Sequence, residues 1–87
     1  MDFEFDKNKS EVNKQKHGID FNKAKKLWED SDYIEIPVKT IDESRFLVIG
    51  KISGKHCTGV ITYRDERIRI ISIRRSRKEE IDIYENQ

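Results

Sequence analysis

The spacing of the apolar residues changes at Asp30-Ser31-Asp32. The apolar residues before this tripeptide recur at three- and four-residue intervals, as on one face of an α-helix: Phe21, Ala24, Leu27 and Trp28. Those that follow it recur at every second residue, as in a β-strand: Ile34, Ile36 and Val38. The sequence therefore predicts an α+β fold in which a helical half precedes a β-sheet.

The helical half begins with a short strand, expected over residues 2–5. Asp6 is a good N-cap for a polar helix of residues 7–17, and Gly18 is a good residue to end it. Asp20 then caps the second, amphipathic helix.

The second half predicts a four-stranded antiparallel meander. Its strands are expected at Ile34–Val38, Arg45–Ile52, His56–Arg64 and Arg67–Arg74. Pro37 marks the first of them as an edge strand, because proline has no backbone N–H to donate to a neighbouring strand. A capping box, with Ser76 at the N-cap and Glu79 at N3, predicts a final helix over residues 77–85. The helices should pack on one face of the sheet, in a single domain spanning residues 1–87.

Charge is distributed unevenly, although the net charge is only +1. Residues 29–43 carry six acidic side chains and one basic one, whereas residues 64–78 carry seven basic side chains and two acidic ones. Residues 7–26 add seven lysines. With 34% apolar and 40% charged residues, the core must be small, so a covering partner would stabilise it. The basic face suits an anionic ligand.

Cysteine and histidine are too scarce for a disulfide framework or a metal cluster. Cys57 is the only cysteine, and His17 and His56 are the only histidines. No apolar run is long enough for a signal peptide or a membrane span. We therefore expect no cofactor, no metal, no membrane contact and a cytoplasmic location.

The last strand combines an apolar run, Ile70-Ile71-Ser72-Ile73, with several arginines. Strict alternation divides it into one face with Arg69, Ile71, Ile73 and Arg75, and another with Ile68, Ile70, Ser72 and Arg74. Apolar residues on both faces indicate a central strand.

The pair Arg74 and Arg75 stands at the exit of this strand, directly before the final helix. Guanidinium groups and helix N-termini both favour phosphate, so we expect the two arginines to leave strand geometry and converge there. On this hypothesis Arg74→Ala and Arg75→Ala each stay folded and lose activity. The alternative is a solvated strand end, or ion pairs with Glu79, Glu80 or the acidic segment.

Lys16-His17-Gly18, at the end of the first helix, also allows two interpretations. The structural one is a glycine C′ residue preceded by cations that favour a helix C-terminus. In the chemical one, His17 is a general acid or base and Lys16 contacts phosphate.

The stretches FEFD, KHGIDF and RIRIISIRRS, in this order and at this chain length, resemble the BrnT family of toxins. The departures are Phe5, where members often have tryptophan, and Ile73, where they often have a small residue. Neither departure alters polar chemistry. The other matching positions lie across nearly the whole chain: Lys9, Asn13, Ala24, Arg45, Gly50, Tyr63 and Tyr84.

The resemblance implies a RelE-like ribonuclease fold and RNA cleavage without a metal. It also implies a BrnA-type antitoxin with a ribbon-helix-helix DNA-binding domain. Operator DNA would then be reached only through this antitoxin.

The inventory of reactive groups fits RNA cleavage, because RNA supplies its own 2′-hydroxyl nucleophile. No serine or cysteine triad, glycine-rich phosphate loop or pair of suitably spaced carboxylates is present. The expected catalytic residues are Lys16, His17, Arg69, Arg74 and Arg75. The expected RNA-binding residues are Lys9, Arg64, Arg77 and Tyr84, whereas Tyr63 is expected to face inward. The alternative function is a non-catalytic module that binds RNA or DNA, or that complexes an antitoxin in operon autoregulation.

Overall fold

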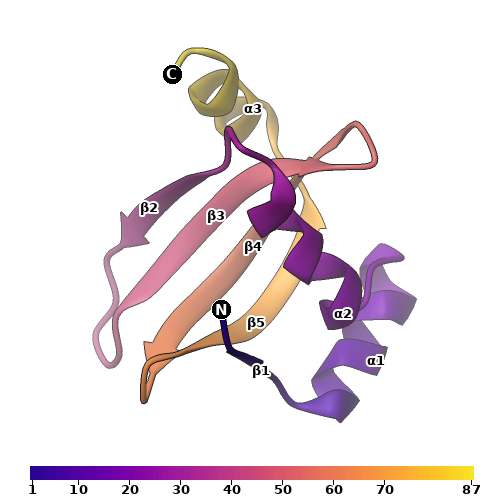
Figure 1. Cartoon of the computed structure of the whole chain (residues 1–87), viewed down its shortest axis with the longest axis vertical. Helices are drawn as coiled ribbons and strands as arrows, with labels where there is room; N and C mark the ends of the chain where they lie inside the picture. The colour runs from indigo at the N-terminus through magenta and orange to yellow at the C-terminus, as the bar shows by residue number, and fades with distance from the viewer.

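The structure is a computed structural model that describes all residues, 1–87. A five-stranded sheet carries helices at its edge and on both of its faces (Figure 1). The elements are β1 (Phe3–Glu4), α1 (Lys7–His17), α2 (Phe21–Ala24), the 3₁₀ helix η1 (Lys25–Glu29), β2 (Ile34–Val38), β3 (Arg45–Ile52), β4 (Lys55–Arg64), β5 (Arg67–Arg75) and α3 (Lys78–Glu85). The α+β class and the order of elements are as expected, but the second helix continues as a 3₁₀ turn.

The sheet has the strand order β1-β5-β4-β3-β2. The predicted meander of β2 to β5 is antiparallel throughout, and β2, which contains Pro37, lies at an edge. The N-terminal strand adds a fifth member, because β1 pairs in parallel with β5 at Ile68 and Arg69. The sheet is therefore mixed, and β5 is an interior strand.

An extra residue in β5 changes which side chains share a face. Val60 of β4 pairs with Ser72, whereas the next residue, Ile61, pairs with Ile70. Ile71 thus has no partner of its own and forms a β-bulge.

The bulge overturns the predicted alternation. Ile68, Ile70 and Ile73 all lie in the same buried cluster, although strict alternation would have separated Ile73 from the other two. Arg75 follows Ile73 onto this face, and Arg69 lies on the opposite one. The expectation that Arg69 and Arg75 share a face is therefore wrong.

The main core lies between the sheet and the α2–η1 segment. Leu27 of η1 is fully buried, and Gly50 and Gly59 leave room for it, since a Cβ on either would come within 3.3 Å of Leu27. The other core residues are Ile19, Phe21, Ala24, Val48, Ile52, Cys57, Ile61, Ile68, Ile70 and Ile73.

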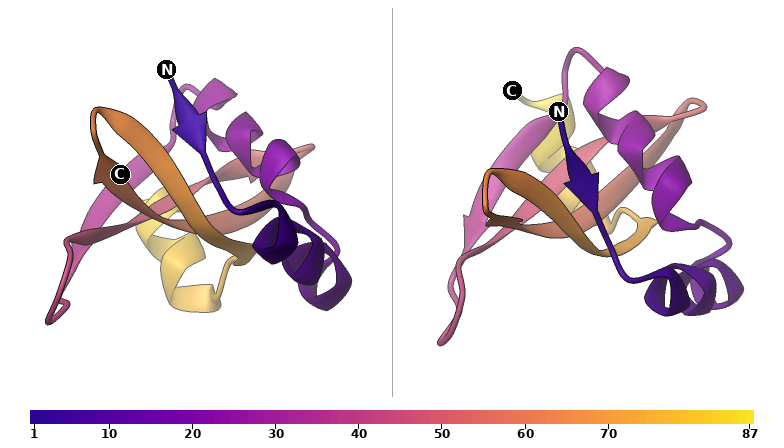
Figure 2. Two further views of the ribbon diagram at one scale, coloured as in Figure 1. Left: turned by 90° about the horizontal axis from the view of Figure 1, so that it is seen from below. Right: turned by 60° about the horizontal axis from the view of Figure 1, so that its bottom comes forward.

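Helix α3 lies on the other face of the sheet, so the expectation of helices on one face only is wrong (Figure 2). Its Glu80 accepts a hydrogen bond from Thr58 of β4, a residue on the face opposite the main core. α3 also begins one residue later than expected, with Arg77 at the N-cap and Glu80 at N3. Ser76 instead stays with the sheet, because its backbone N–H donates to His56 and its hydroxyl contacts that of Thr58.

Helix α1 is held to the edge of β5 by polar contacts, because it offers little apolar surface. The buried Asn13 amide donates to the carbonyls of Ile19 (2.7 Å) and Ile73 (2.8 Å), and its oxygen accepts from the Ile73 N–H. Ser10 accepts from the N–H of Phe21. The helix has the expected ends, with Asp6 as N-cap and Gly18 in the left-handed region at φ 76°.

We predict that Asn13→Ala lowers the free energy of unfolding by about 3 kcal/mol, because it leaves buried backbone groups of Ile73 without partners. Urea unfolding followed by circular dichroism measures the change. The matched control is Asn22→Ala, at an exposed position of α2, which should alter stability by less than about 0.5 kcal/mol. Equal effects of the two substitutions would contradict the role given to the Asn13 amide.

Candidate functional site

Arg74 and Arg75 point to opposite faces of the sheet. β5 stays paired with β4 to its last residue, with Arg74 opposite Thr58 and Arg75 opposite Cys57. Because successive strand residues face opposite sides, the expected convergence of the two guanidinium groups does not occur.

Arg74 is committed to an ion pair. Its two terminal nitrogens donate to the two Glu80 carboxylate oxygens, each at 2.8 Å, and its side chain is only 20% exposed. Glu80 also accepts from the backbone N–H of Arg77, so the anion held at the start of α3 is the chain's own carboxylate. The ion-pair alternative from the sequence is the one observed for Arg74, and the expectation of a solvent-facing side chain there is wrong.

Three other basic residues that the sequence suggested do not join Arg75 at one site. Arg69 donates to Glu4 at 2.9 Å, and lies roughly 20 Å along β5 from Arg75 at about 3.3 Å per strand residue. Arg64 lies 3.5 Å from Glu43 at the far end of β4. Arg77 is exposed beside α3. These positions contribute charge to the surface but do not meet at one point.

Arg75 instead borders a pocket of about 220 Å³ with His17, which we call the cationic pocket. The end of α1, the start of α2, the β3–β4 hairpin and the end of β5 enclose it. Its lining residues are His17, Gly18, Ile19, Lys23, Ile52, Ser53, Lys55, Cys57 and Arg75. Two of these, Lys23 and Lys55, were not singled out from the sequence, because they are distant from each other along the chain and stand in no motif.

The charges of the cationic pocket are not neutralised within the chain. Lys23, Lys55 and Arg75 take part in none of the chain's salt bridges, and no acidic side chain lines the pocket. Burial raises the pKa of the Cys57 thiol, while these three cations act in the opposite direction. Such a pocket can hold an anion with several oxygens, as a phosphate has.

A second pocket, of about 340 Å³, lies between α1 and β5. It collects two further expected residues, Lys9 and Lys16, and it shares His17 with the cationic pocket. Of the nine expected site residues, Lys9, Lys16, His17 and Arg75 thus lie in two adjoining pockets.

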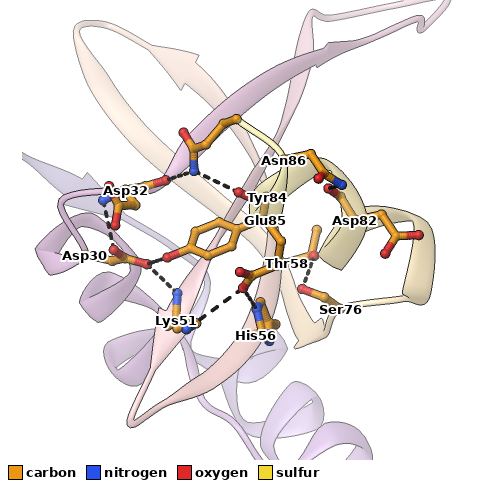
Figure 3. A network of polar contacts seen from close by, with 11 residues as sticks. Asp30, Asp32, Lys51, His56, Thr58, Ser76, Asp82, Tyr84, Glu85 and Asn86 are labelled. Atoms are coloured by element: carbon orange, nitrogen blue, oxygen red, sulfur yellow. Dashed lines mark hydrogen bonds and ion pairs between the residues drawn. The ribbon is translucent and has the colours of Figure 1, made fainter.

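Tyr84, on α3, belongs to a polar network that includes Asp30 (Figure 3). Its hydroxyl donates to Asp30 at 2.7 Å, and the residue is 6% exposed. Burial and the Asp30 carboxylate raise the pKa of Tyr84 to about 12, which disfavours an acid–base role near neutral pH. Asp30 also accepts from the backbone N–H of Lys51, and His56 contacts Glu85 at 2.6 Å.

Tyr63 lies opposite Ile68 of β5 and so on the core face of the sheet, as expected, but it is not buried there. It is 49% exposed, stacks edge-on against Phe46 and donates its hydroxyl to Glu35.

Two features of the whole chain bear on the kind of site it can carry. No three or more His, Cys, Asp or Glu side chains gather where they would hold a metal ion. None of the helices has the length and apolar character needed to cross a membrane.

The fold and site define a small α+β protein with an unneutralised cationic pocket beside a histidine. The profile of one family, described as "Ribonuclease toxin, BrnT, of type II toxin-antitoxin system", matches residues 5–80. The chain belongs to this family, as its sequence motifs suggested. A search of curated proteins finds no match.

We predict that the Arg74–Glu80 pair makes stability depend on pH in the acid range. The hydrogen bonds from Arg74 lower the pKa of Glu80 from 4.5 to about 2, so the carboxylate stabilises the fold above pH 4.5 and this contribution is lost as pH falls toward 2. Relative to Glu80→Gln, the wild type should lose about 2–3 kcal/mol of unfolding free energy over this range. Urea titrations at successive pH values measure it, with Glu79→Gln as the exposed control. A wild type and a Glu80→Gln variant with parallel pH profiles would contradict the assignment.

We predict that Tyr84→Phe lowers the unfolding free energy by about 2 kcal/mol, because the buried hydrogen bond to the Asp30 carboxylate is lost. RNA cleavage by the folded variant should equal that of the wild type. Tyr33→Phe is the control, since the Tyr33 hydroxyl makes no hydrogen bond within the chain. If folded Tyr84→Phe lost cleavage, Tyr84 would have a functional role in addition to its structural one.

Proposed function

We propose that this chain is an endoribonuclease toxin that cleaves RNA, with mRNA as its cellular target, in the cationic pocket. The observation that carries the proposal is the set of three cations, Lys23, Lys55 and Arg75, which lack ion-pair partners and lie beside His17. Membership of a family of ribonuclease toxins supports the same reading.

The proposed reaction is a transesterification. A base removes the proton of the RNA 2′-hydroxyl, and the 2′-oxygen attacks the adjacent phosphorus. The bond from phosphorus to the 5′-oxygen breaks, and an acid returns a proton to that oxygen. The products are a 2′,3′-cyclic phosphate and a free 5′-hydroxyl, and no metal takes part.

The residues divide these tasks by position. His17 borders both pockets and has the acid–base side chain, so it moves the proton. Arg75, with Lys23 and Lys55, stabilises the charge that grows on the phosphorane oxygens. Lys16 and Lys9 bind the neighbouring phosphates. The structure gives Arg69 and Arg74 acidic partners instead, so we assign the two no part in the reaction.

The partner in this proposal is a BrnA-type antitoxin with a ribbon-helix-helix domain, and the complex represses its own operon by binding operator DNA through that domain. Neutralisation would place antitoxin carboxylates against the cationic pocket, which explains why the pocket has no acidic partner of its own. The alternative is a non-catalytic module that binds RNA or DNA through the same pocket.

We predict that Arg75→Ala reduces RNA cleavage by about 10²–10³-fold, because it removes a donor aimed at developing charge. The assay incubates the full chain with RNA in EDTA and detects 2′,3′-cyclic phosphate ends. Melting temperature should be unchanged, since the side chain is exposed and unpaired. The control is Arg67→Ala at the far end of β5, 59% exposed, which should cleave normally.

Two results would contradict the proposal. If the wild-type chain cleaves only when divalent metal is added, the metal-free mechanism is wrong. If it binds RNA but never cleaves it, and Arg75→Ala weakens that binding, the non-catalytic alternative is correct.

A further inference from the structure

The pocket between α1 and β5 has an apolar floor that neither the core nor the proposed chemistry requires. Val12 is 61% exposed on a helix that is otherwise polar. Ile71, the bulge residue of β5, is the other apolar residue that lines this pocket. We call this space the Val12 pocket; it is lined by Asn8, Lys9, Val12, Asn13, Lys16, His17, Ile71 and Ser72.

The rim of the Val12 pocket carries polar side chains that are free to bind. The side chains of Asn8, Lys9, Lys16 and Ser72 make no hydrogen bond or ion pair within the chain. Asn13 differs, because its amide is already committed to Ile19 and Ile73. The pocket therefore has one fixed wall and several polar side chains without partners in the chain around an apolar floor, as small-ligand sites commonly have.

His17 joins this space to the cationic pocket, since it lines both. An RNA strand whose phosphodiester lies at Arg75 would therefore have its neighbouring nucleotide at the Val12 pocket. The lysines at the rim match the negative charge of such a strand.

We propose that the Val12 pocket receives one unpaired base of the RNA, next to the phosphodiester held in the cationic pocket. This inference rests on the proposed function and adds to it the origin of base preference. The faces of the base pack against Val12 and Ile71. The Asn8 amide offers a donor and an acceptor to the edge of the base, the pairing that suits adenine best. Cleavage then depends on the base beside the cut.

A binding experiment tests the pocket without requiring cleavage. The probes are short 2′-O-methyl oligoadenylate, which lacks the 2′-hydroxyl nucleophile, and an abasic oligomer with the same number of phosphates. The wild-type chain should bind the base-bearing probe about tenfold more tightly, which corresponds to ~1.4 kcal/mol. In Val12→Ser this difference should largely disappear, while affinity for the abasic probe is retained.

The matched control is Val38→Ser, at a valine that is 37% exposed on β2, the strand at the opposite edge of the sheet; this variant should bind both probes as the wild type does. Asn8→Asp should reduce the preference for adenylate over cytidylate probes. Unchanged discrimination in both Val12→Ser and Asn8→Asp would overturn the base site. So would a Val12→Ser variant whose single defect is failure to bind a protein partner.

Sequencing the cleavage sites in a random RNA pool separates this proposal from the nuclease assignment. If the wild type cleaves and Val12→Ser cleaves with the same neighbouring bases, the base site is wrong and the nuclease stands. If the wild type does not cleave but its binding shows base dependence through Val12, the nuclease assignment fails and the base site stands.

Discussion

One extra residue in β5 decides which face of the sheet each arginine at the end of this strand occupies. The bulge at Ile71 turns Ile73 toward the main core and so sends Arg75 to the α2 side and Arg74 to the α3 side. Without it, Arg75 would lie with α3, and the pocket beside His17 would lose the arginine that the proposed chemistry needs. Bulges are known to redirect side chains near functional sites, and this one serves the core and the pocket together.

The arginines of β5 differ in whether an acid meets them. Glu4 of β1 forms an ion pair with Arg69, and Glu80 of α3 forms one with Arg74. Both guanidinium groups thus hold a terminal element to the sheet. Arg75 has no such neighbour and shares its pocket with two lysines. Paired arginines of this kind contribute to stability and position, whereas an unpaired cluster in a hollow attracts an anionic ligand.

Much of the fold could be predicted from spacing and caps. The change of period at Asp30 predicted where the helical half gives way to the strands. Asp6 and Gly18 predicted the two ends of α1, and Pro37 predicted that β2 is an edge strand, because these effects are local. The bulge could not be predicted, since the alternation of β5 reads as regular without knowledge of its partner strand. The candidate site could be predicted only in part for the same reason. His17 and Arg75 stand in recognisable motifs, but Lys23 and Lys55 join them through tertiary contacts alone, and Glu80 reached Arg74 from an element expected on the other face.

Asn13 also occupies backbone hydrogen-bonding groups that β5 would otherwise expose at the edge of the sheet. β1 covers β5 only as far as Arg69, and beyond that point the backbone of an interior-type strand would lie open as a template for another chain. The Asn13 amide presents to Ile73 one donor and one acceptor, the same pair that a neighbouring strand would present. At the other edge, Pro37 has no backbone N–H to offer. Asn13 and Pro37 thus reduce the number of free backbone hydrogen-bonding groups at the two edges of the sheet, which disfavours edge-to-edge pairing with another chain.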